Sequence, residues 1–124
     1  IPFDANSFDV VICNHVLEHV EDSHKVMKEF YRVMKPGGWG IFQVPIDSNN
    51  PNTEEDKNVT NPKDRERLYW QDDHLRLFGL DYGKKLAAAG FKVTESDFIN
   101  ELDPKLVDRY ALPKGEIIYF CEKK

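Results

Sequence analysis

The fold of this chain is decided by the stretch Phe8-Asp9-Val10-Val11-Ile12-Cys13-Asn14-His15-Val16-Leu17-Glu18-His19. Its first half is an apolar run without helical spacing, which is typical of a strand buried on both faces of a parallel sheet. We therefore expect a strand over 8–13. Ligands of open α/β sheets bind beyond the carboxyl ends of the strands, so chemistry is expected at the polar residues that follow this strand. These are Asn14, His15, Glu18 and His19.

A helix and a second strand are predicted next. Asp22 is a suitable N-cap, and the apolar residues after it recur at the spacing of one helix face: Val26, Phe30, Val33 and Met34. The turn Pro36-Gly37-Gly38 ends this helix, predicted over 22–35, because proline cannot continue a helix and glycine readily forms a C-cap. An apolar strand over 39–44 follows. Strand, helix and strand in this order form a right-handed βαβ unit, so the two strands are expected to be parallel.

A long polar connection, 47–73, leaves the carboxyl end of the second strand. Structureless connections of this length are usually lids, binding loops or disordered segments. We therefore interpret it either as a lid over the site or as a plain flexible insertion. Asn61-Pro62 can begin a short helix within it, which would carry Tyr69 and Trp70 toward the site.

The rest of the chain predicts two further helices and two further strands. They are a helix over 80–89 closed by Gly90, a strand over 91–98, a short helix over 104–110 that begins at Asp103-Pro104, and a strand over 116–122. The connection between the last two strands is short and permits an antiparallel return. The predicted fold class is therefore α/β, with four strands.

The composition is that of an ordinary globular protein, with 40% apolar and 31% charged residues in 124. The net charge of −5 and the lack of a basic block argue against a nucleic-acid-binding protein. No apolar run approaches the roughly 20 residues that cross a bilayer, so we predict no membrane partner and a cytoplasmic location. Each of the two cysteines falls in an apolar run, which predicts buried free thiols.

The segment His15-Val16-Leu17-Glu18-His19 also matches the zinc-peptidase pattern H-x-x-E-H, in which two histidines bind zinc and the glutamate acts as base. That pattern belongs inside a long helix, whereas here it follows a strand end, and the sequence singles out no third ligand. We therefore predict no metal site and keep a zinc hydrolase as an alternative. Nucleophilic catalysis by Cys13 is disfavoured, because a reactive thiol needs an accessible, electropositive setting.

Several segments follow one another at a distinctive order and spacing: Ile1-Pro2-Phe3, Phe8-Asp9-Val10-Val11, His15 to Val20, Phe30 to Gly38, His74-Leu75-Arg76-Leu77-Phe78, and Gly90-Phe91-Lys92-Val93. Together they resemble the C-terminal half of a class I S-adenosylmethionine-dependent methyltransferase, a Rossmann-like family. The resemblance spans nearly the whole chain outside residues 47–67.

This resemblance implies a sheet of order 3-2-1-4-5-7-6 with strand 7 antiparallel. Residues 1–124 would supply strands 4, 5, 7 and 6, as the C-terminal part of a single methyltransferase domain. It also implies S-adenosylmethionine as cofactor and a small molecule as methyl acceptor. The family's glycine-rich turn, and the acidic residue that holds the cofactor ribose, are not found in this sequence. We therefore expect either a fragment that is inactive alone or a non-catalytic interaction module on a degenerate half-fold.

In both cases the strand over 8–13 would be an unpaired edge. Such an edge pairs readily with another chain, which predicts a homodimer through this strand.

Carried over to this sequence, the resemblance places the methionine end of the cofactor beside Cys13, Asn14 and His15, with Leu17 as an apolar wall. The substrate side would be formed by Glu18, Pro45, Tyr69, Trp70, His74 and Arg76. His19 is the candidate catalytic base, with a structural hydrogen bond as the alternative role. Arg76 is expected either to hold an anionic substrate or to be a solvated charge.

Overall fold

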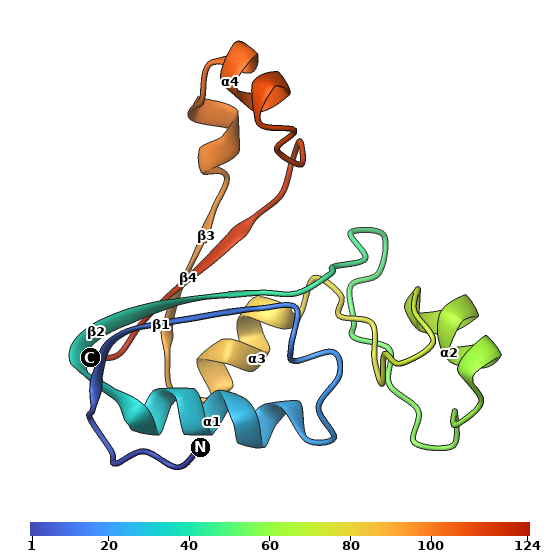
Figure 1. Ribbon diagram of the computed structural model, residues 1–124, viewed down its shortest axis with the longest axis horizontal. Coiled ribbons are helices and arrows are strands. Elements are labelled where there is room, and N and C mark those ends of the chain that lie inside the picture. The colour runs from blue at the N-terminus through green and yellow to red at the C-terminus, as the bar shows by residue number, and fades with distance from the viewer.

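β1 (Phe8–Asn14) and β2 (Met34–Gln43) lie side by side and parallel in a computed structural model that describes all 124 residues. The helix between them, α1 (Ser23–Val33), runs along one face of the sheet (Figure 1). Its N-cap is Asp22, whose carboxylate accepts a hydrogen bond of 2.9 Å from the amide of Lys25. Both the βαβ unit and the cap that begins its helix are therefore confirmed.

The boundary between α1 and β2 differs from the prediction. The helix ends at Val33, not at residue 35, because Met34 takes an extended conformation (φ −76°, ψ 140°) and already pairs with Phe8. Pro36-Gly37-Gly38 accordingly lies inside β2, where the register shifts between Phe8 and Val10 of the partner strand. The proline and glycines therefore mark an irregular start of the strand rather than a loop.

β3 (Lys92–Ser96) and β4 (Ile118–Glu122) complete a four-stranded sheet of order β1-β2-β4-β3. β4 is antiparallel to both of its neighbours. This order confirms the predicted fold class, with the four strands in the places of strands 4, 5, 7 and 6. Both strands are shorter than predicted, because a 3-10 helix, η1 (Phe98–Glu101), and α4 (Pro104–Arg109) extend between them and project from the sheet (Figure 1).

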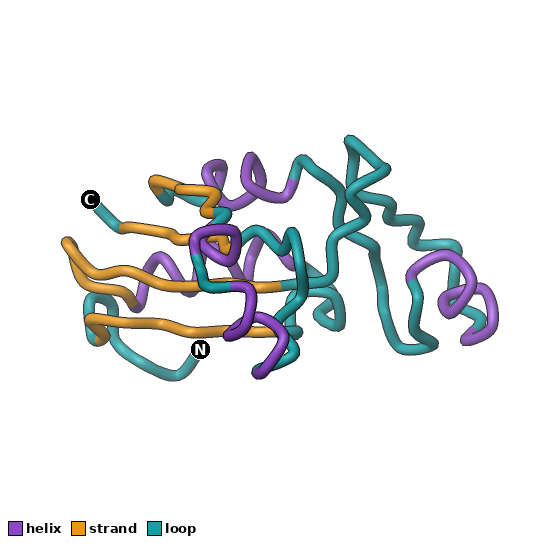
Figure 2. Tube along the Cα trace, turned by 90° about the horizontal axis from the view of Figure 1, so that it is seen from above, coloured by secondary structure: helices purple, strands orange, loops and turns teal.

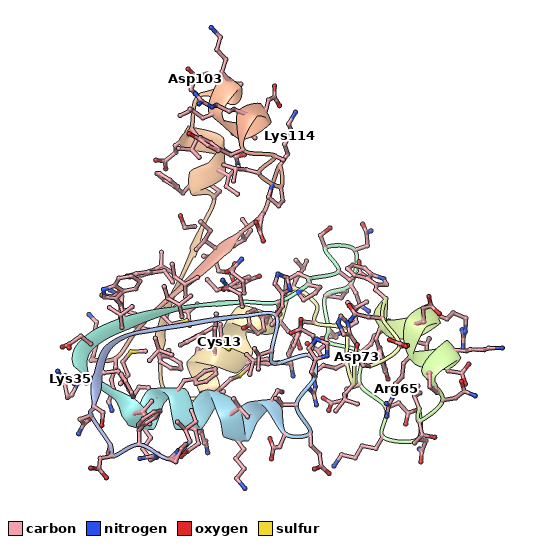
Figure 3. All side chains as sticks on the ribbon, in the orientation of Figure 1. Cys13, Lys35, Arg65, Asp73, Asp103 and Lys114 are labelled. Carbon is pink, nitrogen blue, oxygen red and sulfur yellow. The ribbon has the colours of Figure 1, made fainter.

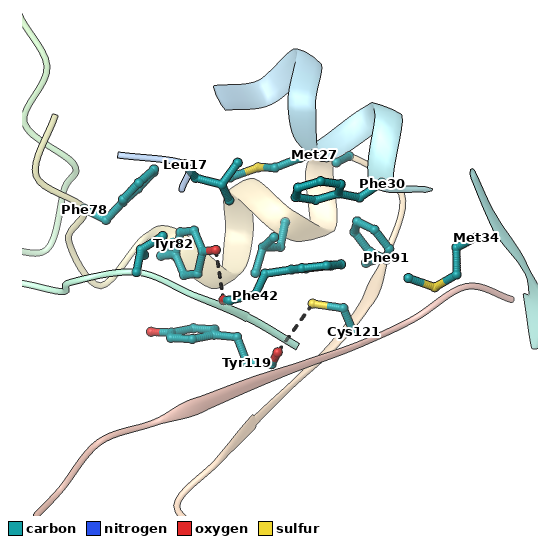
Figure 4. Close-up of a cluster of buried hydrophobic side chains, with 13 residues drawn as sticks. Leu17, Met27, Phe30, Met34, Phe42, Phe78, Tyr82, Phe91, Tyr119 and Cys121 are labelled. Atoms are coloured by element: carbon teal, nitrogen blue, oxygen red, sulfur yellow. Dashed lines mark hydrogen bonds between the residues drawn. The ribbon is translucent and has the colours of Figure 1, made fainter. Parts of the chain in front are cut away.

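The core lies between the sheet and two helices, α1 and α3 (Tyr82–Ala88), that cover the same face (Figure 4). Phe30 of α1 stacks on Phe42 of β2 with ring centroids 5.0 Å apart. The hydroxyl of Tyr82 on α3 donates a hydrogen bond of 3.0 Å to the carbonyl of Phe42. Gly90 follows α3 with a φ of +119°, as the predicted helix end requires.

Apolar side chains on the opposite face of the sheet remain exposed. Ile12 is 61% exposed and Val10 is 41% exposed, and both lie on β1, which is an edge strand. Trp39 on β2 is paired with Val10 and is 36% exposed. The expectation that β1 is buried on both faces is therefore wrong for this chain.

The long connection is more ordered than a structureless loop. It contains α2 (Pro62–Tyr69), which begins after the N-cap Asn61, as Asn61-Pro62 predicts. Two isolated bridges tie the start of this connection to the segment that follows it: Ile46 with Phe78, and Glu54 with Leu77. Figures 1 and 2 show α2 displaced to one end of the molecule, away from the strands. None of the helices has the length and apolar character needed to span a membrane.

Candidate active site

The carboxyl ends of β1 and β2 are joined by a hydrogen bond just beyond β1. The amide of His15 donates to the carbonyl of Gln43 at 2.8 Å. His15 then takes a left-handed backbone conformation with a φ of +54°, which costs a residue other than glycine about 1–2 kcal/mol. This turn directs the chain out of the sheet and into a short turn over residues 16–20, and it leaves the His15 side chain 63% exposed at the edge where ligands are expected.

The turn after β1 buries the carboxylate of Glu18. Its side chain is 2% exposed, and neither carboxylate oxygen has a hydrogen-bond partner. The nearest basic nitrogens belong to two histidines, Nδ1 of His15 at 3.5 Å and Nε2 of His19 at 3.8 Å from Oε1. The prediction placed Glu18 on the substrate side, whereas the structure buries its carboxylate.

His19 and His74 meet edge to face beside this carboxylate, with ring centroids 4.7 Å apart. Nδ1 of His19 lies 3.3 Å from the carboxylate of Asp73. Both ring nitrogens of His19 thus face carboxylates, an arrangement that suits a positioning role better than that of a free base. Figure 3 shows Asp73 between the strand ends and Arg65 of α2.

The side chain of Arg76 binds the backbone of the same turn. Its guanidinium donates to the carbonyls of Leu17 at 2.6 Å, Val20 at 2.6 Å and Glu21 at 3.0 Å, and it pairs with the carboxylate of Glu55 at 2.8 Å. The side chain is 1% exposed. The interpretation of Arg76 as a solvated charge is therefore wrong, and an anionic substrate could reach it only by displacing these bonds.

A cavity of about 360 Å³ opens beside the end of β2. It brings together three of the predicted site residues, His15, Pro45 and Trp70, and Trp70 is 55% exposed there. Tyr69, its neighbour in sequence, is buried, and its hydroxyl instead accepts a hydrogen bond of 2.9 Å from the amide of Asp56. The helix α2 therefore carries one of the two aromatic residues to the cavity and uses the other for packing.

The residues predicted to hold the cofactor lie at the end of β1, but they differ in exposure. Asn14 is exposed, Cys13 is half-buried, and Leu17 is part of the core. Burial, and after it the nearby charge of Glu18, raises the pKa of the Cys13 thiol. This agrees with the expectation that Cys13 is not a nucleophile.

Comparison with known proteins finds similarity to methyltransferases. Residues 1–42, which contain β1, the turn after it and α1, match a family model described as a methyltransferase domain. The demethylmenaquinone methyltransferase of Listeria welshimeri is 43% identical over 61 residues, which are 49% of this chain and 25% of that protein. The phosphoethanolamine N-methyltransferase 2 of Haemonchus contortus, solved with S-adenosyl-L-methionine, covers 98% of this chain with a TM-score of 0.54. The chain has the fold of a class I methyltransferase.

The structural likeness concerns the fold alone. The Haemonchus enzyme is 17% identical, and the chain covers 34% of it. The [4+2]-cyclase SpnF, also 17% identical, has a TM-score of 0.63 over 99% of this chain and 53% of its own. Methyltransferases and a cyclase thus share the fold, so the fold does not assign the reaction.

The two cavities are also lined by residues that the sequence did not indicate. The cavity beside β2 is also lined by Gln43, Leu80 and residues 113–117, the turn that precedes β4. A second cavity of about 480 Å³ is lined by Lys57, Arg65 and His19, among others. These residues come from distant parts of the chain, and no local pattern marks them.

Proposed function

We propose that this chain forms the acceptor site and part of the cofactor site of an S-adenosylmethionine-dependent methyltransferase that acts on a small molecule. The observation that carries the proposal is the methyltransferase-domain match over residues 1–42. It includes the strand end at Asn14 and His15, which lies at the carboxyl edge of the sheet. The name of the Listeria relative supports a quinone-like ring as the acceptor class.

The residues present fit the methionine end of the cofactor. The backbone at Asn14 and His15 is exposed at the edge, and the half-buried Cys13 borders it. When bound, the cofactor supplies an electrophilic methyl group on its sulfonium. These 124 residues contain no glycine-rich turn, so they supply only part of the cofactor site and are not expected to be active alone.

The cavity beside β2 is the proposed acceptor site. Pro45, Ile46 and Trp70 offer apolar surface, and the pocket adjoins His15 at the end of β1. Holding an acceptor atom in line and near contact with the methyl group is the main contribution that such a pocket makes to the rate. The segment 47–73 would act as the lid, with Trp70 at the C-terminal end of α2.

A methyl-transfer assay tests this proposal. The protein from the complete reading frame that encodes these residues should transfer tritium from methyl-labelled S-adenosylmethionine to an acceptor, with a demethylated quinol tried first. Trp70→Ala should raise KM for the acceptor at least tenfold and leave KM for S-adenosylmethionine unchanged. Tyr110→Ala is the matched control, because it removes an aromatic side chain that is 62% exposed at the end of α4. It should change neither KM.

A second candidate is a non-catalytic interaction module. The exposed apolar side chains of Val10 and Ile12 favour it. It predicts no tritium transfer to any acceptor, and that result would overturn the methyltransferase proposal.

A further inference from the structure

Three side chains with metal-binding atoms meet at the turn after β1. Glu18, His19 and His74 each offer one ligand atom, and these atoms all lie within 4.8 Å of one another. The first two come from the turn, and the third comes from the segment that follows α2. We propose that these three residues bind one divalent cation of the zinc type.

The carboxylate of Glu18 is the strongest sign of a missing ligand. It is 2% exposed, and both of its oxygens lack a hydrogen-bond partner. Buried carboxylates are normally paired with a cation or hydrogen-bonded, because an isolated buried charge is strongly unfavourable. A cation bound between Glu18 and the two histidines would give this carboxylate the positive partner that it lacks.

The two histidines are oriented as metal ligands are. Nδ1 of His74 lies 2.8 Å from the carbonyl oxygen of Tyr69, which can only accept, so Nδ1 carries the proton and the lone pair of Nε2 is free. Nδ1 of His19 faces the carboxylate of Asp73 at 3.3 Å, and Nε2 faces Glu18. Histidines that bind metals almost always donate their other N–H to a carboxylate or a backbone carbonyl. Both histidines of this cluster meet that condition.

The donor set selects the class of ion. Two imidazoles and one carboxylate suit zinc, cobalt or nickel, whereas calcium and magnesium prefer oxygen ligands throughout. Zinc holds such ligands at about 2.0–2.2 Å, which brings their donor atoms to about 3.5 Å from one another. Side-chain rotations that move the donor atoms by about 1 Å would bring the present cluster to these distances.

Three protein ligands leave a fourth position open for water or a bound molecule. His19 is 33% exposed and lines the cavity of about 480 Å³ described above, so this position is reachable from solvent. The proposed site differs from the linear pattern H-x-x-E-H, because His74 replaces His15. His15 is 63% exposed and lies outside the cluster.

Cobalt titration into the chain is the experiment that tests the site. Cobalt should bind in a 1:1 ratio with the intense visible bands of a four-coordinate ion, and zinc should displace it. His74→Ala should weaken zinc affinity at least 100-fold in competition with a chromophoric chelator, and Asp73→Asn should weaken it 10- to 100-fold. His15→Ala and the matched control His24→Ala should stay within twofold of the wild type. Zinc binding that survives His74→Ala, or that His15→Ala abolishes, would overturn the proposal.

Glu18→Gln gives a second test that does not depend on a fragile variant. It removes a buried charge without changing the shape of the side chain, so the metal-free variant should melt at the same temperature as the wild type or higher. Zinc should raise the melting temperature of the wild type, because an ion that binds only the folded state stabilises it. The shift should vanish in Glu18→Gln, and an equal shift in both proteins would contradict the site.

Discussion

Among single residues, Arg76 ties the turn after β1 to the segment that precedes α2. Its guanidinium joins three backbone carbonyls of one turn to the carboxylate of Glu55. Lysine carries the same charge but lacks the planar fork that makes several directed bonds at once. Arg76→Lys should therefore lower the free energy of unfolding by about 2–4 kcal/mol, measured by urea denaturation. Arg109→Lys, on the exposed end of α4, is the control and should change it by less than about 0.5 kcal/mol.

Buried ionisable side chains set the alkaline limit of stability. Burial raises the pKa of Cys121 from 9.0 to about 12 and that of Tyr119 from 10.0 to about 12. Between the unfolded and folded values the unfolded chain binds fewer protons, so stability falls as pH rises. The loss should begin near pH 9 and continue to about pH 12.

Urea midpoints recorded from neutral pH upward should show this decline, and Cys121→Ala should make it shallower. A midpoint that stays constant through this range would contradict the assignment of both groups as buried and neutral.

Part of the candidate site could be predicted from the sequence. Asn14 ends β1, and His15, Glu18 and His19 come within five residues of it, so their place near the carboxyl end of this strand was predictable from the sequence. The partnership of His74 with Glu18 was not, because 56 positions separate residues 18 and 74. The contacts of Arg76 were missed for the same reason, since its carbonyl partners at residues 17, 20 and 21 lie more than 50 positions away in the sequence.

At the level of the elements, the glycine that follows α3 shows how one residue determines where a helix ends. Gly90 has a φ of +119°, and a Cβ there would lie 3.1 Å from the ring of Tyr31. Gly115 has a φ of +77°, and a Cβ there would have no atom within 4 Å. A side chain at this position therefore meets backbone strain but no steric contact. Gly115→Ala should cost about 1–2 kcal/mol of stability, and Gly90→Ala should cost more. A loss of stability at Gly90 no larger than that at Gly115, in thermal or urea unfolding, would contradict this ranking.

Caps and periodicity predicted which elements exist, but not always where they end. Asp22, Asn61 and Asp103 each begin a helix, because each accepts a hydrogen bond from a backbone amide of the first turn. The boundary between α1 and β2 was wrong, because pairing of Met34 with β1 overrides the local helical preference. Pairing across the sheet is a tertiary effect that a local pattern does not contain.

At the scale of the whole molecule, the sheet leaves β1 as an edge with apolar side chains exposed. Edge strands of this kind pair with other chains unless charge or bulges prevent it. The 124-residue chain should therefore self-associate in light scattering, and Ile12→Lys should shift it toward the monomer. Leu106→Lys places the same charge at another exposed apolar side chain, on α4, and should have no effect. A monomer at all concentrations would contradict the prediction.

The central claim is that the carboxyl end of β1 holds the methyl donor. Its most direct test is calorimetric titration of S-adenosylhomocysteine into the protein from the complete reading frame. Micromolar binding is expected, and Asn14→Arg, which places bulk at the exposed strand end, should weaken it at least tenfold, while Asn58→Arg in the polar connection should not. Binding that Asn14→Arg leaves intact, or no binding at all, would contradict the account.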